Sequence, residues 1–243
     1  LALPLLAGVF VFDNDHPCVG PDEPTPDPVG PPFRVAPARG RSRVVCFDPR
    51  HDASLASLDE EGVAAVLFAY REEERACASD PDLVQMLAFE NRGAVVGVSN
   101  PHPHCQAYGT DFIFRLIETE VRESRKHYAS HGQALYRAVI DQERSDGVRM
   151  MAENDTMVAF VPYFARYPYE VHVAPVETRR SVADLTVQEA DDFAAILKVV
   201  LCKFDNVFRM SFPYVMTFHQ APTDGEDHRS FHFHVEFYPP LRN

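Results

Sequence analysis

The sequence lacks three features that would each point to a different class of protein. It contains no run of about 18 apolar residues, the length that spans a bilayer, so we expect no membrane segment. Basic side chains are few: 23 Lys and Arg against 36 Asp and Glu give a net charge of −13, which argues against a broad nucleic-acid-binding surface. No Cys-X-X-Cys pair occurs, and the five scattered cysteines indicate reduced thiols in a cytoplasmic protein.

The N-terminal segment gives little indication of targeting. The apolar stretch 1–6 is too short for a signal peptide and has no basic start. The first residue is Leu1 rather than Met, so we expect further residues before it. Residues 17–40 are rich in Pro, Asp and Gly, which predicts an irregular loop.

The remaining sequence contains an internal repeat of one structural unit. In the first copy a strand at 43–47 is followed by a helix starting near Asp59, a strand at 84–89 and a His-X-His pair at 102–104. In the second, a strand at 169–173 precedes a helix that starts at Thr186, then strands at 214–218 and 231–236, the last with His-X-His at 232–234. This pattern predicts an α+β fold of two fused halves, each an antiparallel sheet with a helix packed on it. We expect the halves to be residues 1–114 and 151–243, joined by linking helices at 115–150.

The segment Asn100-Pro101-His102-Pro103-His104-Cys105-Gln106 carries the clearest chemical signal. In an extended strand, alternate side chains share a face, so His102, His104 and Gln106 point the same way. The two prolines stiffen the backbone in this extended geometry. A neutral imidazole is a competent nucleophile at neutral pH, and an amide can donate to an oxygen that gains charge. The alternative for a His-X-His pair is a metal site or two ordinary surface histidines.

This segment resembles the active-site signature of the galactose-1-phosphate uridylyltransferases, within the histidine-triad superfamily. The resemblance runs from about residue 8 to the end of the chain and includes other segments in the family's order. These are residues 11–15, 89–93, 161–165, 204–208, 211–214 and 237–241. The resemblance therefore implies two fused histidine-triad-like halves.

The resemblance also implies a reaction and the residues that perform it. His104 would be the nucleophile that forms a uridylyl-histidine intermediate, and Gln106 would hold the transferred phosphoryl group. UDP-glucose would charge the histidine, and galactose-1-phosphate would then take the UMP to give UDP-galactose. A homodimer is implied as well, with part of each active site coming from the partner chain. The residues implied in contacts with uridine, ribose or phosphates are Asn14, Asp15, Asn91, Ser99 and Asn100.

Two metal sites are implied by the same resemblance. His51 and His102 correspond to two ligands of a zinc site whose Cys-X-X-Cys should precede Val11, where this sequence has no such pair. Two histidines are too few for a closed structural zinc site, which takes four ligands. The second site would bind zinc or iron, and its ligands would be Glu120, His219, His234 and Glu236. The alternative is a packed, hydrogen-bonded set of side chains without metal.

Two other functions remain open from the sequence. The first is a nucleotide phosphorylase or adenylyltransferase of the same superfamily that uses His104 on another nucleotide. The second, from a different class, is a non-catalytic module that binds a nucleotide or a metal, which the missing N-terminal residues and the missing Cys-X-X-Cys leave open. Formation of a covalent intermediate would distinguish the enzymes from the module.

Overall fold

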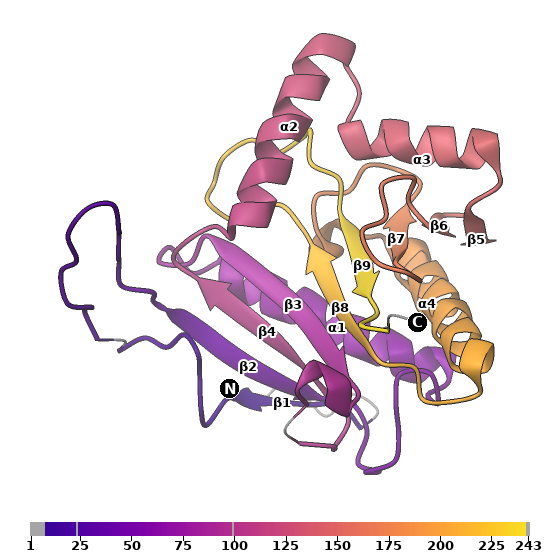
Figure 1. Ribbon diagram of the computed structural model, residues 1–243, viewed down its shortest axis with the longest axis horizontal. Coiled ribbons are helices and arrows are strands. Elements are labelled where there is room, and N and C mark those ends of the chain that lie inside the picture. The colour runs from indigo at the N-terminus through magenta and orange to yellow at the C-terminus, as the bar shows by residue number, and fades with distance from the viewer. Residues whose placement is uncertain (1–7, 23, 99, 242–243) are drawn as a thin grey trace.

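The computed structural model describes residues 8–22, 24–98 and 100–241, and these form one antiparallel sheet with four α-helices (Figure 1). The strands lie in the order β1-β2-β4-β3-β8-β9-β7-β6-β5. The helices are α1 (Glu60–Ala78), α2 (Arg115–His131), α3 (Leu135–Asp146) and α4 (Val187–Phe208). The strands are β1 (Phe10–Asp13), β2 (Gly40–Cys46), β3 (Gln85–Arg92), β4 (His104–Thr110), β5 (Met150–Glu153), β6 (Met157–Phe160), β7 (Val171–Pro175), β8 (Tyr214–His219) and β9 (His234–Tyr238).

The internal repeat is visible in the topology. In each half a strand leads into a long helix and then into two further strands, and the spatial orders β2-β4-β3 and β7-β9-β8 are equivalent. The two sheets join at the β3–β8 pair, where Asn91 lies opposite Val215. The predicted α+β fold with antiparallel strands is confirmed, and the strands of both halves continue into a single sheet.

Local sequence signals explain where the two long helices begin. The Asp59 side chain accepts a hydrogen bond from the backbone N–H of Gly62 at 2.8 Å, which caps α1. Thr186 and Glu189 form the predicted capping box of α4, with each side chain accepting the other residue's backbone N–H. Such caps contribute about 1 kcal/mol each because they satisfy N–H groups that have no partner inside the helix.

The helices cover the sheet on different faces. Helices α1 and α4 lie side by side behind the sheet in Figure 1 and bury their apolar faces in the main core, which includes Tyr70, Phe193 and Leu197. Helix α3 packs on the opposite face, where Ile140 contacts Val158 and Phe160. The predicted linking helices are thus α2 and α3. None of the helices in the described part of the chain combines the length and apolar character that crossing a membrane requires.

Polar contacts also connect the halves. Arg92 at the end of β3 makes two hydrogen bonds to the carboxylate of Asp205 on α4, at 2.9 and 2.8 Å. The Tyr214 hydroxyl on β8 donates to Glu90 on β3 at 2.8 Å. These buried contacts and the continuous sheet fix the position of one half relative to the other. The predicted irregular loop at 17–40 is confirmed, since its described residues contain only an isolated bridge before β2.

A carboxyl group buried between the halves predicts how stability depends on pH. Glu74 on α1 accepts a hydrogen bond from Gln220 at 2.8 Å, and burial, together with the charge of Asp184, raises the pKa of Glu74 from 4.5 to about 8. The folded protein keeps this proton to a higher pH than the unfolded chain does. The free energy of unfolding therefore falls as the pH rises from the unfolded pKa to the folded one.

We expect Glu74→Gln to flatten this decline and to raise the free energy of unfolding at about pH 9 by on the order of 1–3 kcal/mol. Denaturant unfolding curves measured at several pH values would check this. The partly exposed Glu72→Gln, on the same helix, is the control and should leave the pH dependence unchanged. A Glu74→Gln protein with the same pH dependence as the unmodified protein would contradict the assignment.

Candidate active site and a buried cation cluster

His104 is the first residue of β4, and its ring is held in one tautomer. Its Nδ1 lies 2.8 Å from the backbone carbonyl oxygen of His102. Because a carbonyl oxygen can only accept, Nδ1 must carry the proton, and the lone pair is then on Nε2. Among the described residues no hydrogen bond to Nε2 is found, and the side chain is half-buried. The arrangement presents one imidazole nitrogen as a nucleophile or a ligand.

Gln106 and Tyr108 follow His104 on the same face of β4. The Tyr108 hydroxyl donates to Gln106 Oε1 at 2.7 Å, which leaves both N–H groups of the amide free to donate elsewhere. Burial, followed by contacts with Cys18, raises the pKa of Tyr108 to about 12, so the hydroxyl keeps its proton at neutral pH. The ring of Tyr108 packs edge-on against Phe89, with 5.0 Å between centroids.

Two clefts open beside His104. One, of about 470 Å³, is lined by Asn14, Asp15 and Asn100 together with His104 and Gln106. The other, of about 270 Å³, is lined by Asn91 and also reaches Asn100 and His104. The structure therefore brings together all of the described residues that the sequence predicts as nucleotide contacts. Ser99, the remaining predicted contact, lies outside the described residues.

His51 and His102 lie together, as the first predicted zinc site requires. Their Nδ1 atoms are 2.9 Å apart, and one of the rings must donate to the other. In the described part of the chain, neither histidine belongs to a group of three or more His, Cys, Asp or Glu side chains that could hold an ion. Among the residues that the structure describes, this position thus has two potential ligands and no third.

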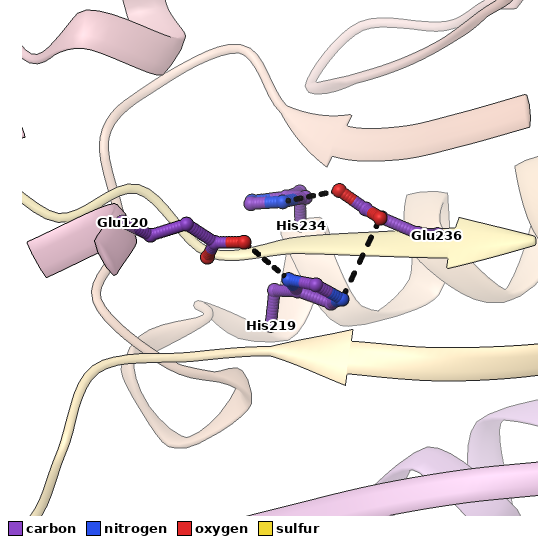
Figure 2. A group of neighbouring side chains, drawn as sticks. All are labelled: Glu120, His219, His234 and Glu236. Atoms are coloured by element: carbon purple, nitrogen blue, oxygen red, sulfur yellow. Dashed lines mark hydrogen bonds and ion pairs between the residues drawn. The ribbon is translucent and has the colours of Figure 1, made fainter. Parts of the chain in front are cut away.

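The four side chains predicted for the second metal site also converge, between α2, β8 and β9 (Figure 2). Glu120 Oε1 lies 2.8 Å from His219 Nδ1, and Glu236 lies 3.1 Å from His234 Nε2 and 3.6 Å from His219 Nε2. All ligand atoms of the set are within 4.8 Å of one another. Glu120 Oε2 is buried and has no hydrogen-bond partner. Two imidazoles, two carboxylates and an unsatisfied oxygen fit a divalent cation, which would satisfy that oxygen.

The carboxylates and imidazoles of this cluster shift each other's pKa values toward the charged forms. Burial alone would raise the pKa of Glu236, but the hydrogen bond with His234 and the nearby His219 hold it well below its usual range. Burial alone would lower the pKa of His219, but the neighbouring Glu120 raises it above its usual value. Glu236 is therefore ionised at neutral pH, as metal ligation requires.

Two further side chains of the cluster were missed from the sequence. Glu170, just before β7, and His172, within it, are fully buried, and His172 lies opposite Glu236 in the β7–β9 pair. The signal was present, because Glu170-Val171-His172 has the same alternation as His234-Val235-Glu236. Its meaning depended on β7 lying beside β9, which the sequence alone did not show.

Comparison with known proteins places this fold and site in a defined class. A solved structure of a uridylyltransferase superimposes on 97% of this chain with a TM-score of 0.90 and 33% sequence identity, and 75% of that protein is covered. Residues 3–113 match the N-terminal domain of galactose-1-phosphate uridyl transferase, and residues 120–243 match the C-terminal domain. The chain belongs to the galactose-1-phosphate uridyl transferase family.

Curated relatives support this assignment. The galactose-1-phosphate uridylyltransferase of Haemophilus influenzae is 36% identical over 233 residues, which are 96% of this chain and 66% of the relative. The enzyme of Rattus norvegicus is also 36% identical, over 238 residues, which are 96% of this chain and 62% of the relative. The chain thus spans slightly less than two thirds of the length of these two relatives.

Proposed function

We propose that this protein transfers UMP from UDP-glucose to galactose-1-phosphate, through a uridylyl group carried on His104. The observation that carries the proposal is the fixed tautomer of His104, whose Nε2 lone pair faces clefts lined by the predicted nucleotide contacts. Membership of the family supports the choice of substrates.

In the first half-reaction, Nε2 of His104 attacks the α-phosphorus of UDP-glucose. A P–N bond forms, the P–O bond to the β-phosphate breaks, and glucose-1-phosphate leaves with the electron pair. The ring gains positive charge as this occurs, and the hydrogen bond from Nδ1–H to the His102 carbonyl stabilises that charge. In the second half-reaction a phosphate oxygen of galactose-1-phosphate attacks the same phosphorus, and the P–N bond breaks to release UDP-galactose.

Gln106 is placed to donate to the phosphoryl oxygens during both displacements. Its amide orientation matters, because an amide turned by half a rotation would present an oxygen to the phosphate instead of N–H groups. Tyr108 favours the productive orientation by donating to Gln106 Oε1. Tyr108 is thus a positioning residue that acts through Gln106.

Removing the Tyr108 hydroxyl should slow the chemical step. We expect Tyr108→Phe to lower kcat by on the order of 5- to 30-fold, which corresponds to a lost hydrogen bond, while KM for UDP-glucose changes little. Steady-state kinetics of both half-reactions would measure this, with Phe89→Leu as a control for altered packing of the Tyr108 ring. An effect confined to KM would show that Tyr108 contributes to binding rather than to orienting Gln106.

The remaining predicted roles are parts of the same proposal. Asn14 and Asp15 would contact the nucleoside from one cleft, and Asn91 from the other, with Ser99 and Asn100 near the phosphates. We also propose a cytoplasmic homodimer that completes its active sites with residues of the partner chain.

A divalent zinc or iron ion would be held by Glu120, His219, His234 and Glu236, and a zinc ion would be held in part by His51 and His102. The fit of the first set rests on its buried unpaired oxygen and its two imidazoles. When bound, the ion would supply structural cross-linking, since its ligands come from α2, β8 and β9. It lies in the half that does not contain His104.

Intact-protein mass spectrometry tests the proposal. Mixing the protein with UDP-glucose alone should add the mass of one UMP, and galactose-1-phosphate should remove it. If only inorganic phosphate or a different acceptor removed the nucleotidyl group from the protein, the nucleotide phosphorylase or adenylyltransferase would be favoured. A folded protein that binds UDP-glucose and forms no adduct would be a binding module.

A further inference from the structure

The cluster in the C-terminal half contains a second group of potential ligands. Beside the four side chains in Figure 2, His172 on the neighbouring strand β7 and Glu170, just before that strand, approach Glu236. His172 Nε2 is 3.1 Å from Glu170 Oε1 and 3.5 Å from Glu236 Oε1. Two ligand atoms bound tetrahedrally to one zinc ion are about 3.3 Å apart, given bonds of about 2.0–2.1 Å. His172 Nε2 thus has the spacing of a fellow ligand from each of the two oxygens, and the ligand atoms of all three residues lie within 4.8 Å of one another.

Surrounding groups orient these two side chains so that their remaining atoms, Glu170 Oε1 and His172 Nε2, face one another at hydrogen-bond distance, 3.1 Å. Glu170 Oε2 accepts the backbone N–H groups of Arg166 and Tyr167, at 2.8 and 3.0 Å, and Oε1 remains. His172 Nδ1 is hydrogen-bonded to the Tyr136 hydroxyl at 2.7 Å, and Nε2 remains. Metal-binding histidines typically use their second ring nitrogen in this way, which fixes the tautomer and the ring orientation.

Glu236 connects the two groups of ligands. Its Oε1 is the oxygen nearest His172 and His234, whereas its Oε2 is the oxygen nearest His219. The ligand atoms therefore separate into two overlapping sets that share only this carboxylate. Glu236 Oε1 lies beside one imidazole of each set, those of His172 and His234, which places this carboxylate to bridge two ions.

The negative charge of the cluster also favours the binding of cations. Three carboxylates, those of Glu120, Glu170 and Glu236, are at least partly buried within it. In the described part of the chain, Arg166 is the one Lys or Arg whose side chain pairs with any of them, and half of that side chain is exposed. Buried carboxylates are costly unless a cation or hydrogen bonds offset their charge.

We propose that Glu170, His172 and Glu236 hold a second divalent cation, adjacent to the one at Glu120, His219 and His234, with Glu236 bridging the two. The ligand set of one imidazole and two carboxylates suits zinc or ferrous iron. This ion links β7 to β9 and, through Tyr136, to α3. The proposal depends on the first site only through the shared Glu236 and does not depend on the transferase activity.

Metal counting on three matched variants tests the proposal. The protein is loaded with Zn²⁺, freed of unbound ion by gel filtration and analysed by inductively coupled plasma mass spectrometry. Relative to the unmodified protein, His172→Gln and His219→Gln should each lose one zinc per chain, and Glu236→Gln should lose two. Any zinc at His51 and His102 cancels in these differences. A His172→Gln protein that keeps every zinc, or a Glu236→Gln protein that loses only one, would overturn the proposal.

The unmodified protein gives an independent answer if a variant does not fold. Crystals of the zinc-loaded protein should show two anomalous-scattering peaks at the zinc edge, one between Glu170 and His172 and one between Glu120 and His219. A single peak next to Glu120, with the Nε2 proton of His172 shared with Glu170, would show that these two residues form a hydrogen-bonded support and not a site.

Discussion

Replacing His104 by Ala should abolish uridylylation of the protein. The imidazole supplies the atom to which UMP is transferred, and the neighbouring thiol of Cys105 is fully buried on the opposite face of β4. Burial raises the pKa of the Cys105 thiol well above its usual value, so no thiolate is present at neutral pH. We expect kcat to fall by on the order of 10⁴-fold or more, as for other enzymes that lose their nucleophile.

The measurement is intact mass after addition of UDP-glucose, together with steady-state rates. His131→Ala is a matched control, because His131 is an exposed histidine at the end of α2 and should leave both readings unchanged. A His104→Ala protein that still gains one UMP would show that another residue is the nucleophile and would remove the basis of the proposed mechanism.

Gln106→Glu should be almost as damaging, although the two side chains have nearly the same shape. The second half of the molecule shows the reason. His234 and Glu236 occupy on β9 the positions that His104 and Gln106 occupy on β4, and His234 Nδ1 bonds to the His232 carbonyl at 2.9 Å. There, Glu236 Oε1 lies 3.1 Å from His234 Nε2, the nitrogen that would otherwise be free. A carboxylate at position 106 would engage the nucleophilic nitrogen of His104 in the same way.

Two effects of that carboxylate act in the same direction. It would favour protonation of His104, which removes the lone pair, and it would repel the phosphoryl oxygens of the substrate. We expect kcat to fall by on the order of 10³-fold, and part of the activity to return at lower pH as the introduced carboxyl is protonated.

Gln106→Met distinguishes the effect of an added negative charge from the effect of losing the amide donor. It removes the amide without adding charge, so we expect a smaller loss, on the order of 10- to 100-fold, that does not recover at lower pH. The pH dependence of kcat for the two variants gives the comparison. Equal losses with parallel pH profiles would show that Gln106 acts only as a donor and that its neutrality is unimportant.

The comparison of the two halves also explains why only one carries the proposed chemistry. Both place a histidine at the start of a strand, fix its Nδ1 proton on a carbonyl two residues earlier, and follow it with a tyrosine that donates to the intervening side chain. They differ in that side chain, an amide in one half and a carboxylate in the other. A neutral donor leaves the imidazole free for a phosphate, whereas a carboxylate gives the same geometry a set of side chains that could hold a cation.

Much of this protein could be read from the order of its residues. The starts of α1 and α4 followed from Asp59 and from the Thr186–Glu189 capping box, because caps depend on residues three positions apart. The shared face of His104 and Gln106 followed from the alternation of side chains along a strand. Both are local consequences of backbone geometry, and the structure contains both as expected.

The tertiary structure decided how distant strands meet. Two features depend on strand pairing: the joining of two sheets at β3 and β8, and the placement of Glu170 and His172 beside Glu236. Alternation along a strand says which residues share a face, and it does not say which strand lies next to it. The sequence by itself therefore determined the family, the repeated α+β unit and the histidine motif. Only the folded chain determined the extent of the buried cluster, because its residues are far apart in the sequence. The tautomer of His104 and the orientation of Gln106 involve residues only two positions away, but they depend on rotamers that the sequence pattern does not specify.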